Sequence, residues 1–178
     1  GANVLNLKYS GPGISKQPVP LSALYAPCQT CSDGLFWFPF NQTSGLSTTE
    51  AGGFASAQLN GYTNDPNQWV AGRFNRALNF DGINHFVSVS GFDSITGAAP
   101  RTCAAWVKPT SSASLPVISW GPNTTGNRWT LMLQGGNLRT EISGGSVQGT
   151  RLLNDGQWHH IACTLEGDGT SDVTETKL

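Results

Sequence analysis

Apolar residues alternate with polar ones over short stretches of this chain, and this period of two constrains the fold more than any other feature. The alternation recurs at Phe86–Val89, Val117–Trp120, Trp129–Leu133, Leu138–Ile142 and Ile161–Leu165. Successive side chains of a strand point to opposite faces of a sheet, so this period is typical of strands with one buried face. Apolar residues nowhere recur at helical spacing over three turns.

Turn-forming residues separate these stretches. The chain has 22 glycines and 10 prolines, and the Asp-Gly pairs at residues 81–82 and 155–156 are typical of tight turns. Three phenylalanines at alternate positions in residues 35–40 predict one more strand. The sequence therefore predicts an all-β protein, a sandwich of two antiparallel sheets.

Composition excludes several classes of partner. The chain has 178 residues, of which 38% are hydrophobic and 12% charged, with a formal net charge of -1. Recognition of nucleic acid or of an anionic membrane needs clustered Lys and Arg, which this balance does not provide. A membrane-spanning helix needs about 20 apolar residues in a row, and the sequence has no such run. We therefore expect neither nucleic acid binding nor membrane insertion.

Four motifs in the second and larger part of the chain carry a family resemblance. They are GLFWFPFNQTSG from Gly34, GRFNRALNFDG from Gly72, TCAAWVKP from Thr102 and LLNDGQWHHIACTLEG from Leu152. In this order they resemble the laminin G-like domains, which have the concanavalin A-type jelly roll and include the pentraxins. The resemblance implies a jelly roll over residues 33–178 that holds glycans or proteins rather than changing them chemically. We expect the large rings of Phe80, Trp106 and Trp158 to fill the space between its sheets.

The beginning of the chain resembles a different family. Residues 1–25, with LNLKYSGPGISKQPVPLSALY, resemble the last strand and exit segment of a PA14-type β domain, and residues 26–32 would then be a linker. The alternative is that this segment is the first strand of the main domain.

Laminin G-like domains normally continue beyond a segment like TETKL into further strands, so we expect the jelly roll to lack its last strands here. An open sheet edge recruits other chains. We predict that Val4–Tyr9 covers this edge, or that a second copy does so as a homodimer through the edge or by strand exchange.

Four cysteines raise two questions of pairing. In pentraxins a disulfide joins the strands that correspond to those of Cys103 and Cys163. Here one cysteine is shifted one residue earlier and the other one residue later, which keeps the two opposite each other in antiparallel neighbours. A disulfide and a pair of buried thiols both remain open. Cys28 and Cys31 lie in the linker and favour a local disulfide over a redox or zinc site.

Aromatic rings near expected loops are the candidates for sugar binding, because a ring stacks on a pyranose while amides and charged groups meet its hydroxyls. The candidate carbohydrate-binding residues are Tyr62, Trp69, Trp120, Asn64, Asn123 and Arg128, and Asn60, Asp65 and Asn67 flank them. Packing of each tryptophan in the core is the alternative.

Calcium is common in the family that the chain resembles, and oxygen ligands suit it. Asp81, Asn84 and Asp93 are the candidate ligands. No other cofactor is expected. His159 and His160 are adjacent, so in a strand they point to opposite faces and cannot chelate one ion together.

An enzymatic role is not expected of this chain. The jelly-roll glucanases supply their carboxylates from one strand as Glu-x-Asp-x-x-Glu, and this pattern does not occur. Neither a Gly-x-Ser-x-Gly motif nor a phosphate-binding glycine loop occurs.

The sequence thus predicts a non-catalytic, carbohydrate-binding module of a larger extracellular or cell-surface protein, with a glycan or glycosylated surface as partner. One alternative is a structural or protein-adhesion module without a sugar site. Another is an accessory module of a polysaccharide-degrading enzyme.

Overall fold

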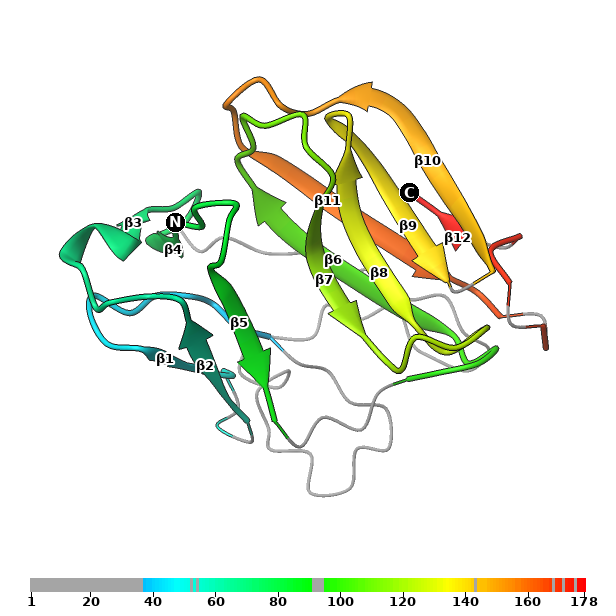
Figure 1. Cartoon of the computed structure of the whole chain (residues 1–178), viewed down its shortest axis with the longest axis horizontal. Coiled ribbons are helices and arrows are strands. Elements are labelled where there is room, and N and C mark those ends of the chain that lie inside the picture. Colours follow the sequence, from blue (N-terminus) through cyan, green and yellow to red (C-terminus); the bar gives the residue numbers. More distant parts are fainter. Residues whose placement is uncertain are drawn as a thin grey trace, which may run out of the picture. The chain divides into compact units, whose positions relative to one another are not determined.

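The structure, a computed structural model, describes residues 37–178 except residues 52, 54, 91–94, 143, 168, 171 and 175. The chain divides into two compact units, Gly1–Gly91 and Phe92–Leu178, here called the N-terminal unit and the C-terminal unit. In the described part of both units nearly all regular structure is β-strand, and every paired strand is antiparallel (Figure 1). The all-β class predicted from the alternation is confirmed.

Short strands build the N-terminal unit. Its sheet has the order β1-β2-β5, and a separate hairpin pairs β3 with β4. The strands are β1 (Ser47–Thr49), β2 (Ser56–Asn60), β3 (Trp69–Ala71), β4 (Arg76–Leu78) and β5 (Phe86–Val89), and a 3-10 turn, η1 (Pro66–Gln68), precedes β3.

A small core lies within this unit. Leu59, Tyr62, Trp69 and Leu78 are its buried members, and Phe40, Leu46 and Val87 pack against them. Leu59 and Ala57 are buried while their neighbours in β2 are exposed or half-buried, so β2 has the burial pattern of a strand with one covered face.

Longer strands build the C-terminal unit, which contains two sheets. One has the order β10-β9-β8-β7 and the other the order β12-β11-β6. The strands are β6 (Arg101–Val107), β7 (Leu115–Trp120), β8 (Trp129–Gln134), β9 (Asn137–Ile142), β10 (Gly145–Leu152), β11 (His159–Leu165) and β12 (Thr176–Lys177).

Alternate residues of these strands form one larger core. Its buried members are Cys103, Trp129, Leu131, Leu133, Leu138, Ile142, Leu153, Ile161, Cys163 and Leu165. Because side chains alternate, the intervening residues of β8 and β9 form the other face of the β7–β10 sheet. Complete burial of a leucine such as Leu131 stabilises the fold by about 1.5–3 kcal/mol.

Two expectations about aromatic residues were wrong. Residues 37–40 form no strand, because Phe40 has a φ of 51°, in the left-handed region that interrupts an extended chain. Trp106 is 40% exposed and Phe80 is 50% exposed, while Trp158 is half-buried. In β6 the alternate residues Cys103, Ala105 and Val107 belong to the core, so Trp106 faces away from it.

Several sequence predictions lie outside the described residues. They concern the PA14-type segment, the linker with Cys28 and Cys31, the covering strand Val4–Tyr9 and the calcium candidate Asp93. These stay predictions, as does the single jelly roll over residues 33–178.

Candidate functional site

A polar pocket of about 300 Å³ lies within the N-terminal unit. It is lined by Gly61, Tyr62, Thr63, Asp65, Asn67, Gln68, Asn79 and His85. These residues come from the loop after β2, from η1, from the end of β4 and from the turn before β5. We call this the Tyr62 pocket.

Local chain geometry brings η1 to the pocket. The Oδ1 atom of Asp65 accepts a hydrogen bond of 2.7 Å from the backbone N–H of Asn67, and Pro66 follows directly. This is the arrangement that starts a helical turn. The turn presents Asn67 at the surface and Gln68 in the interior.

A glycine closes the wall opposite this turn. Gly61 has a φ of 80°, and a Cβ atom there would lie 2.5 Å from the carbonyl oxygen of Asn84. Both the backbone conformation and the close approach require glycine.

Gln68 carries an unused hydrogen-bond acceptor. The residue is 4% exposed, and its Nε2 atom donates a hydrogen bond of 2.6 Å to the carbonyl oxygen of Gly45. That bond fixes which end of the amide is which. The Oε1 atom is buried and has no partner in the described part of the chain. An unpaired buried acceptor lowers the stability of the fold by about 1–3 kcal/mol. A hydrogen bond from a donor that reached this oxygen would therefore be favourable.

Aromatic rings form one wall of the pocket. The ring of His85 stacks on that of Tyr62 with 3.9 Å between centroids, and the ring of Phe80 meets Tyr62 edge-on at 6.1 Å. The Tyr62 hydroxyl donates to the carbonyl oxygen of Asn79 at 3.0 Å. Burial, and secondly the nearby charge of Asp81, raise the pKa of Tyr62, so its phenol is neutral. Phe80 leaves half of its surface to solvent beside this wall.

Asp81 fixes the turn that carries His85. Its Oδ1 atom accepts backbone N–H bonds from Ile83, Asn84 and His85 at 2.9–3.1 Å, and its Oδ2 atom lies 3.6 Å from Nε2 of His85. The backbone bonds, with that from Ile83 the strongest, lower the pKa of Asp81. The carboxylate is therefore a structural acceptor in this turn.

The calcium prediction finds little support in this geometry. Asp81 and Asn84 do lie in one turn, but Asp81 Oδ1 is already bonded to three N–H groups. Among the residues that the structure describes, no group of three or more His, Cys, Asp or Glu side chains could hold a metal ion.

The structure places two predicted sugar-binding residues in structural roles. Trp69 is 2% exposed in the small core, so its predicted role as a stacking surface was wrong. Asn64 has a φ of 61°, and its Oδ1 atom accepts a bond from the N–H of Gly45. Tyr62 is 8% exposed, and it contributes to the pocket as part of its wall.

The other three predicted sugar-binding residues lie in the C-terminal unit, in or next to the turn between β7 and β8. The ring of Trp120 stacks on that of Trp129 in the core at 5.8 Å, and its Nε1 atom donates to the carbonyl oxygen of Ile95. Arg128 instead forms an ion pair with Glu141. Asn123 is exposed in the turn between β7 and β8. Trp120 is partly buried and packs against the core, so one side of its ring is covered by Trp129.

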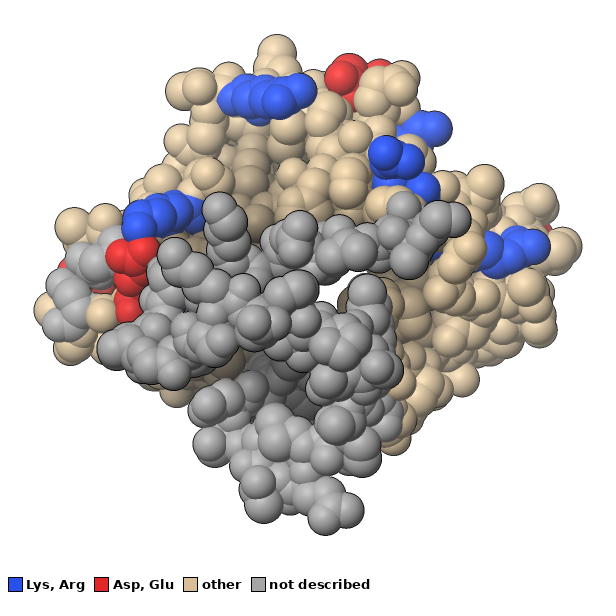
Figure 2. All heavy atoms as spheres, turned by 180° about the vertical axis from the view of Figure 1, so that it is seen from behind, with Lys and Arg blue, Asp and Glu red and all other residues tan. Residues whose placement is uncertain are grey.

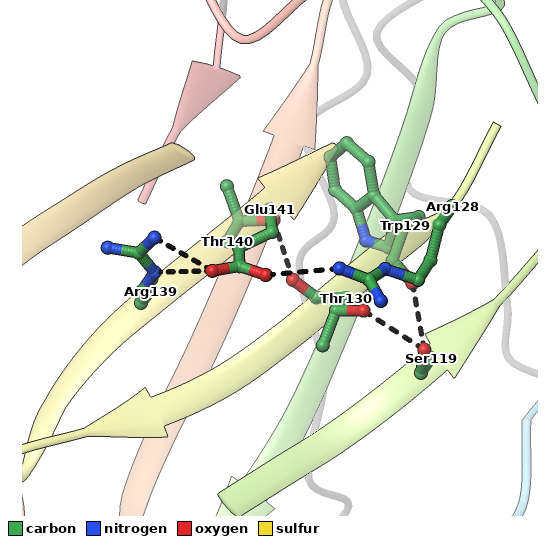
Figure 3. A network of polar contacts seen from close by, with 7 residues as sticks. All are labelled: Ser119, Arg128, Trp129, Thr130, Arg139, Thr140 and Glu141. Carbon is green, nitrogen blue, oxygen red and sulfur yellow. Dashed lines mark hydrogen bonds and ion pairs between the residues drawn. The ribbon is translucent and has the colours of Figure 1, made fainter. Parts of the chain in front are cut away.

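A network of polar contacts joins β7, β8 and β9, as Figure 3 shows. Glu141 lies between two arginines, 3.5 Å from Arg128 and 2.7 Å from Arg139. Ser119 and Thr130 form a hydrogen bond across β7 and β8 at 3.0 Å. Both arginines share the one carboxylate of Glu141, and partly exposed pairs of this kind contribute about 0–1 kcal/mol each. We interpret this network as one that holds neighbouring strands together.

Cys103 and Cys163 are direct cross-strand partners in β6 and β11, as the paired one-residue shifts predicted. Both are free and buried. The indole N–H of Trp129 donates to Sγ of Cys103 at 3.2 Å. Burial raises the pKa of Cys103 to about 12 and also raises the pKa of Cys163. The structure therefore has the pair of buried thiols rather than the disulfide.

Sequence analysis missed Gln68, Asn79 and His85 as pocket residues. One signal was available for His85, because the pattern Asp-Gly-x-x-His occurs twice, at Asp81–His85 and at Asp155–His159. Both histidines lie within ion-pair distance of the aspartate four residues earlier. Gln68 and Asn79 follow no pattern, since folding alone brings the two segments together.

Basic side chains do not form one continuous surface on the face that Figure 2 shows; the described Lys and Arg residues there lie in several separate places. A search of the described residues for a membrane-spanning helix found no candidate of sufficient length and apolar character.

Comparison with protein families gives one match. A laminin G family model, described as the concanavalin A-like lectin/glucanases superfamily, matches residues 81–174. No curated protein and no solved structure matches the chain significantly.

Proposed function

The chain belongs to the concanavalin A-like lectin/glucanases superfamily, and from this premise we propose that it is a non-catalytic carbohydrate-binding module of an extracellular or cell-surface protein. The superfamily supports a carbohydrate-binding or adhesion-type module. The observation that carries the finer proposal is the Tyr62 pocket, which combines amide and carboxylate side chains with the rings of Tyr62 and His85, next to the half-exposed ring of Phe80.

The lining of the pocket suits a sugar. Ligand sites commonly combine an apolar or aromatic wall with a few polar groups that fix orientation. Phe80 offers an exposed ring face for the apolar side of a pyranose, next to the ring of Tyr62. Asn67, Gln68 and Asn79 offer amide groups to sugar hydroxyls.

The same lining supports a role without catalysis. Hydrolysis of a glycosidic bond by a retaining enzyme takes two carboxyl groups about 5 Å apart. Asp65 is the one carboxylate among the described residues that line the pocket, and its Oδ1 atom already caps η1. We therefore place the activity of this module in binding, whatever the parent protein does.

Glycan binding by the whole chain tests the proposal. The folded chain is screened on an array of neutral and acidic polysaccharides, and hits are measured by calorimetry with and without a calcium chelator. We expect binding that the chelator leaves unchanged. Asn67→Ala and Phe80→Ala should each weaken it about tenfold, the loss of roughly one good contact.

Gln148→Ala is the matched control, because Gln148 is an exposed residue of β10 in the C-terminal unit. It should bind like the native chain. A sample that melts cooperatively and binds no glycan, or one that binds equally well after both pocket substitutions, would sink the proposal.

A second candidate function, protein adhesion, rests on a separate observation. Phe80, Ile83 and Phe86 are 50%, 90% and 56% exposed in one short segment of the N-terminal unit. Apolar groups that gather at a surface are typical of contact sites. A second copy of the chain is the partner to test first, by sedimentation velocity with Ile83→Lys as the variant. A native chain that stays monomeric at high concentration argues against this candidate.

A further inference from the structure

We infer that the Tyr62 pocket takes a neutral glycan through its hydroxyl groups and discriminates against sulfated glycans and uronic acids. This inference rests on the proposed function, since it names the ligand class of the same site. Two independent features of the pocket carry it: the sign of its charge and the kind of unpaired hydrogen-bonding group among its lining residues.

The charge of the pocket is negative. Asp65 lines it. The charge of Asp81 helps to raise the pKa of Tyr62, and the carboxylate of Asp81 lies within ion-pair distance of His85. Among the described residues that form the lining, none is Lys or Arg. Nε2 of His85 lies 3.6 Å from Oδ2 of Asp81. Like charges repel more strongly where the surroundings are partly apolar, so a sulfate or carboxylate in this pocket is disfavoured.

The buried amide of Gln68 requires a donor. Gln68 lines the pocket, and its amide orientation is fixed because Nε2 donates to the carbonyl oxygen of Gly45, which leaves the buried Oε1 atom without a partner in the described part of the chain. A sugar hydroxyl has a proton to donate to this oxygen. The oxygens of a sulfate ester or an ionised carboxylate have none, so they can only accept. The Oε1 atom of Gln68 therefore favours a hydroxyl group and disfavours an anionic substituent.

The cost of the mismatch is large enough to measure. A site built to bond a hydroxyl rejects an analogue that lacks it, because its own buried polar group is then left unpaired. With repulsion from Asp65 added, we expect an acidic glycan to bind at least about tenfold more weakly than the neutral glycan with the same backbone.

The experiment compares matched pairs by calorimetry on the whole chain at low salt. The probes are galacto-oligosaccharides with and without sulfate esters, and gluco- and galacto-oligosaccharides beside oligogalacturonate of equal length. Preference for the neutral members supports the inference. The acidic members could instead bind equally well or more tightly, with Asn67→Ala abolishing that binding. This result overturns the inferred ligand class, while the proposed function stands. Binding of neither class overturns the proposed function, and the inference with it.

A charge-only substitution sharpens this test. Asn is as good a cap as Asp, so Asp65→Asn keeps the bond to the N–H of Asn67 and removes the charge. We expect it to raise the affinity for the acidic probes severalfold and to leave the neutral probes unchanged. Asp172→Asn, in the C-terminal unit, alters the net charge equally at a residue outside the pocket lining. If both variants change acidic binding alike, the preference does not arise in the pocket.

Discussion

The same five-residue pattern, Asp-Gly-x-x-His, occurs once in each unit and has different roles in the two. In the C-terminal unit Asp155 accepts the N–H of Gln157 and lies 2.8 Å from Nε2 of His159, at the start of β11. In the N-terminal unit Asp81 takes three backbone N–H groups, and His85 stacks on Tyr62 instead. The pattern makes the turn, and what packs against the histidine decides whether it orders a strand end or lines a pocket.

The buried cores of the two units differ in size. Among the described residues, ten form the buried cluster of the C-terminal unit, whereas four form that of the N-terminal unit. The smaller core includes Tyr62, which lines the pocket and whose ring meets the half-exposed ring of Phe80. We interpret the C-terminal unit as the part that stabilises the fold and the N-terminal unit as the part that binds.

The largest expected effect concerns one tryptophan of each core. Trp129 is fully buried, bonds Sγ of Cys103 and lies under the guanidinium of Arg101 at 5.0 Å. Trp129→Ala should lower the free energy of unfolding by about 3–5 kcal/mol, and Trp69→Ala by the lower end of that range, because fewer groups surround it. Urea unfolding, monitored by hydrogen exchange in each unit, measures the loss of stability in both variants. An equal or greater loss from Trp69→Ala would contradict the difference between the cores.

An intermediate effect is expected on binding when the two histidines are compared. His85→Ala removes the ring that stacks on Tyr62 and part of the pocket wall. It should weaken glycan binding about tenfold, or 1.4 kcal/mol. His159→Ala removes the partner of Asp155 outside the pocket and should leave the affinity unchanged. Calorimetry with the best neutral glycan decides, and equal losses in both variants would break the division of roles.

The smallest effect is expected in the pH dependence of stability. The pKa values of Asp81 and Asp155 are both lowered, the first chiefly by the backbone bond from Ile83 and the second chiefly by the bond with His159. A lowered pKa stabilises the fold above the ordinary carboxyl pKa of about 3.9, and this contribution is lost as the pH falls through the lowered value. Asp81→Asn and Asp155→Asn should therefore melt slightly below the native chain at pH 7.

The difference in melting temperature should begin to shrink below about pH 4 and vanish only below the lowered pKa values, where the native carboxylates also become protonated. Thermal melts of the three chains over this range provide the measurement. Differences in melting temperature that stay constant with pH would show that the carboxylate charge does not contribute to stability in either turn.

Much of the fold could be predicted because it depends on local order. The alternation predicted β5, β7, β8, β9 and β11, the family resemblance implied β6, and the paired shifts predicted that Cys103 lies opposite Cys163. The strands missed were β1, β2, β3, β4, β10 and β12. Several are only two or three residues long, and β10 contains glycines where alternation would need side chains.

The site was less predictable, because the same residue type serves both core and surface. Tyr62, Trp69 and Trp120 all read as aromatics near polar loops, yet Trp69 and Trp120 pack in the two cores. Phe80 was expected inside and is half exposed. Which face of a ring is covered depends on segments far away in the chain, and alternation does not specify those segments.

The sequence by itself determined the all-β class, the positions of the longer strands and the Asp-Gly turns, since these follow from side-chain period and from backbone preferences of neighbouring residues. Only the tertiary structure decided that η1, the end of β4 and the turn before β5 meet in one pocket. It also decided that Nε2 of Gln68 reaches the carbonyl of Gly45, 23 residues away, which leaves Oε1 as an unpaired acceptor. Local preferences act over a few residues, whereas a binding site needs groups that folding brings together.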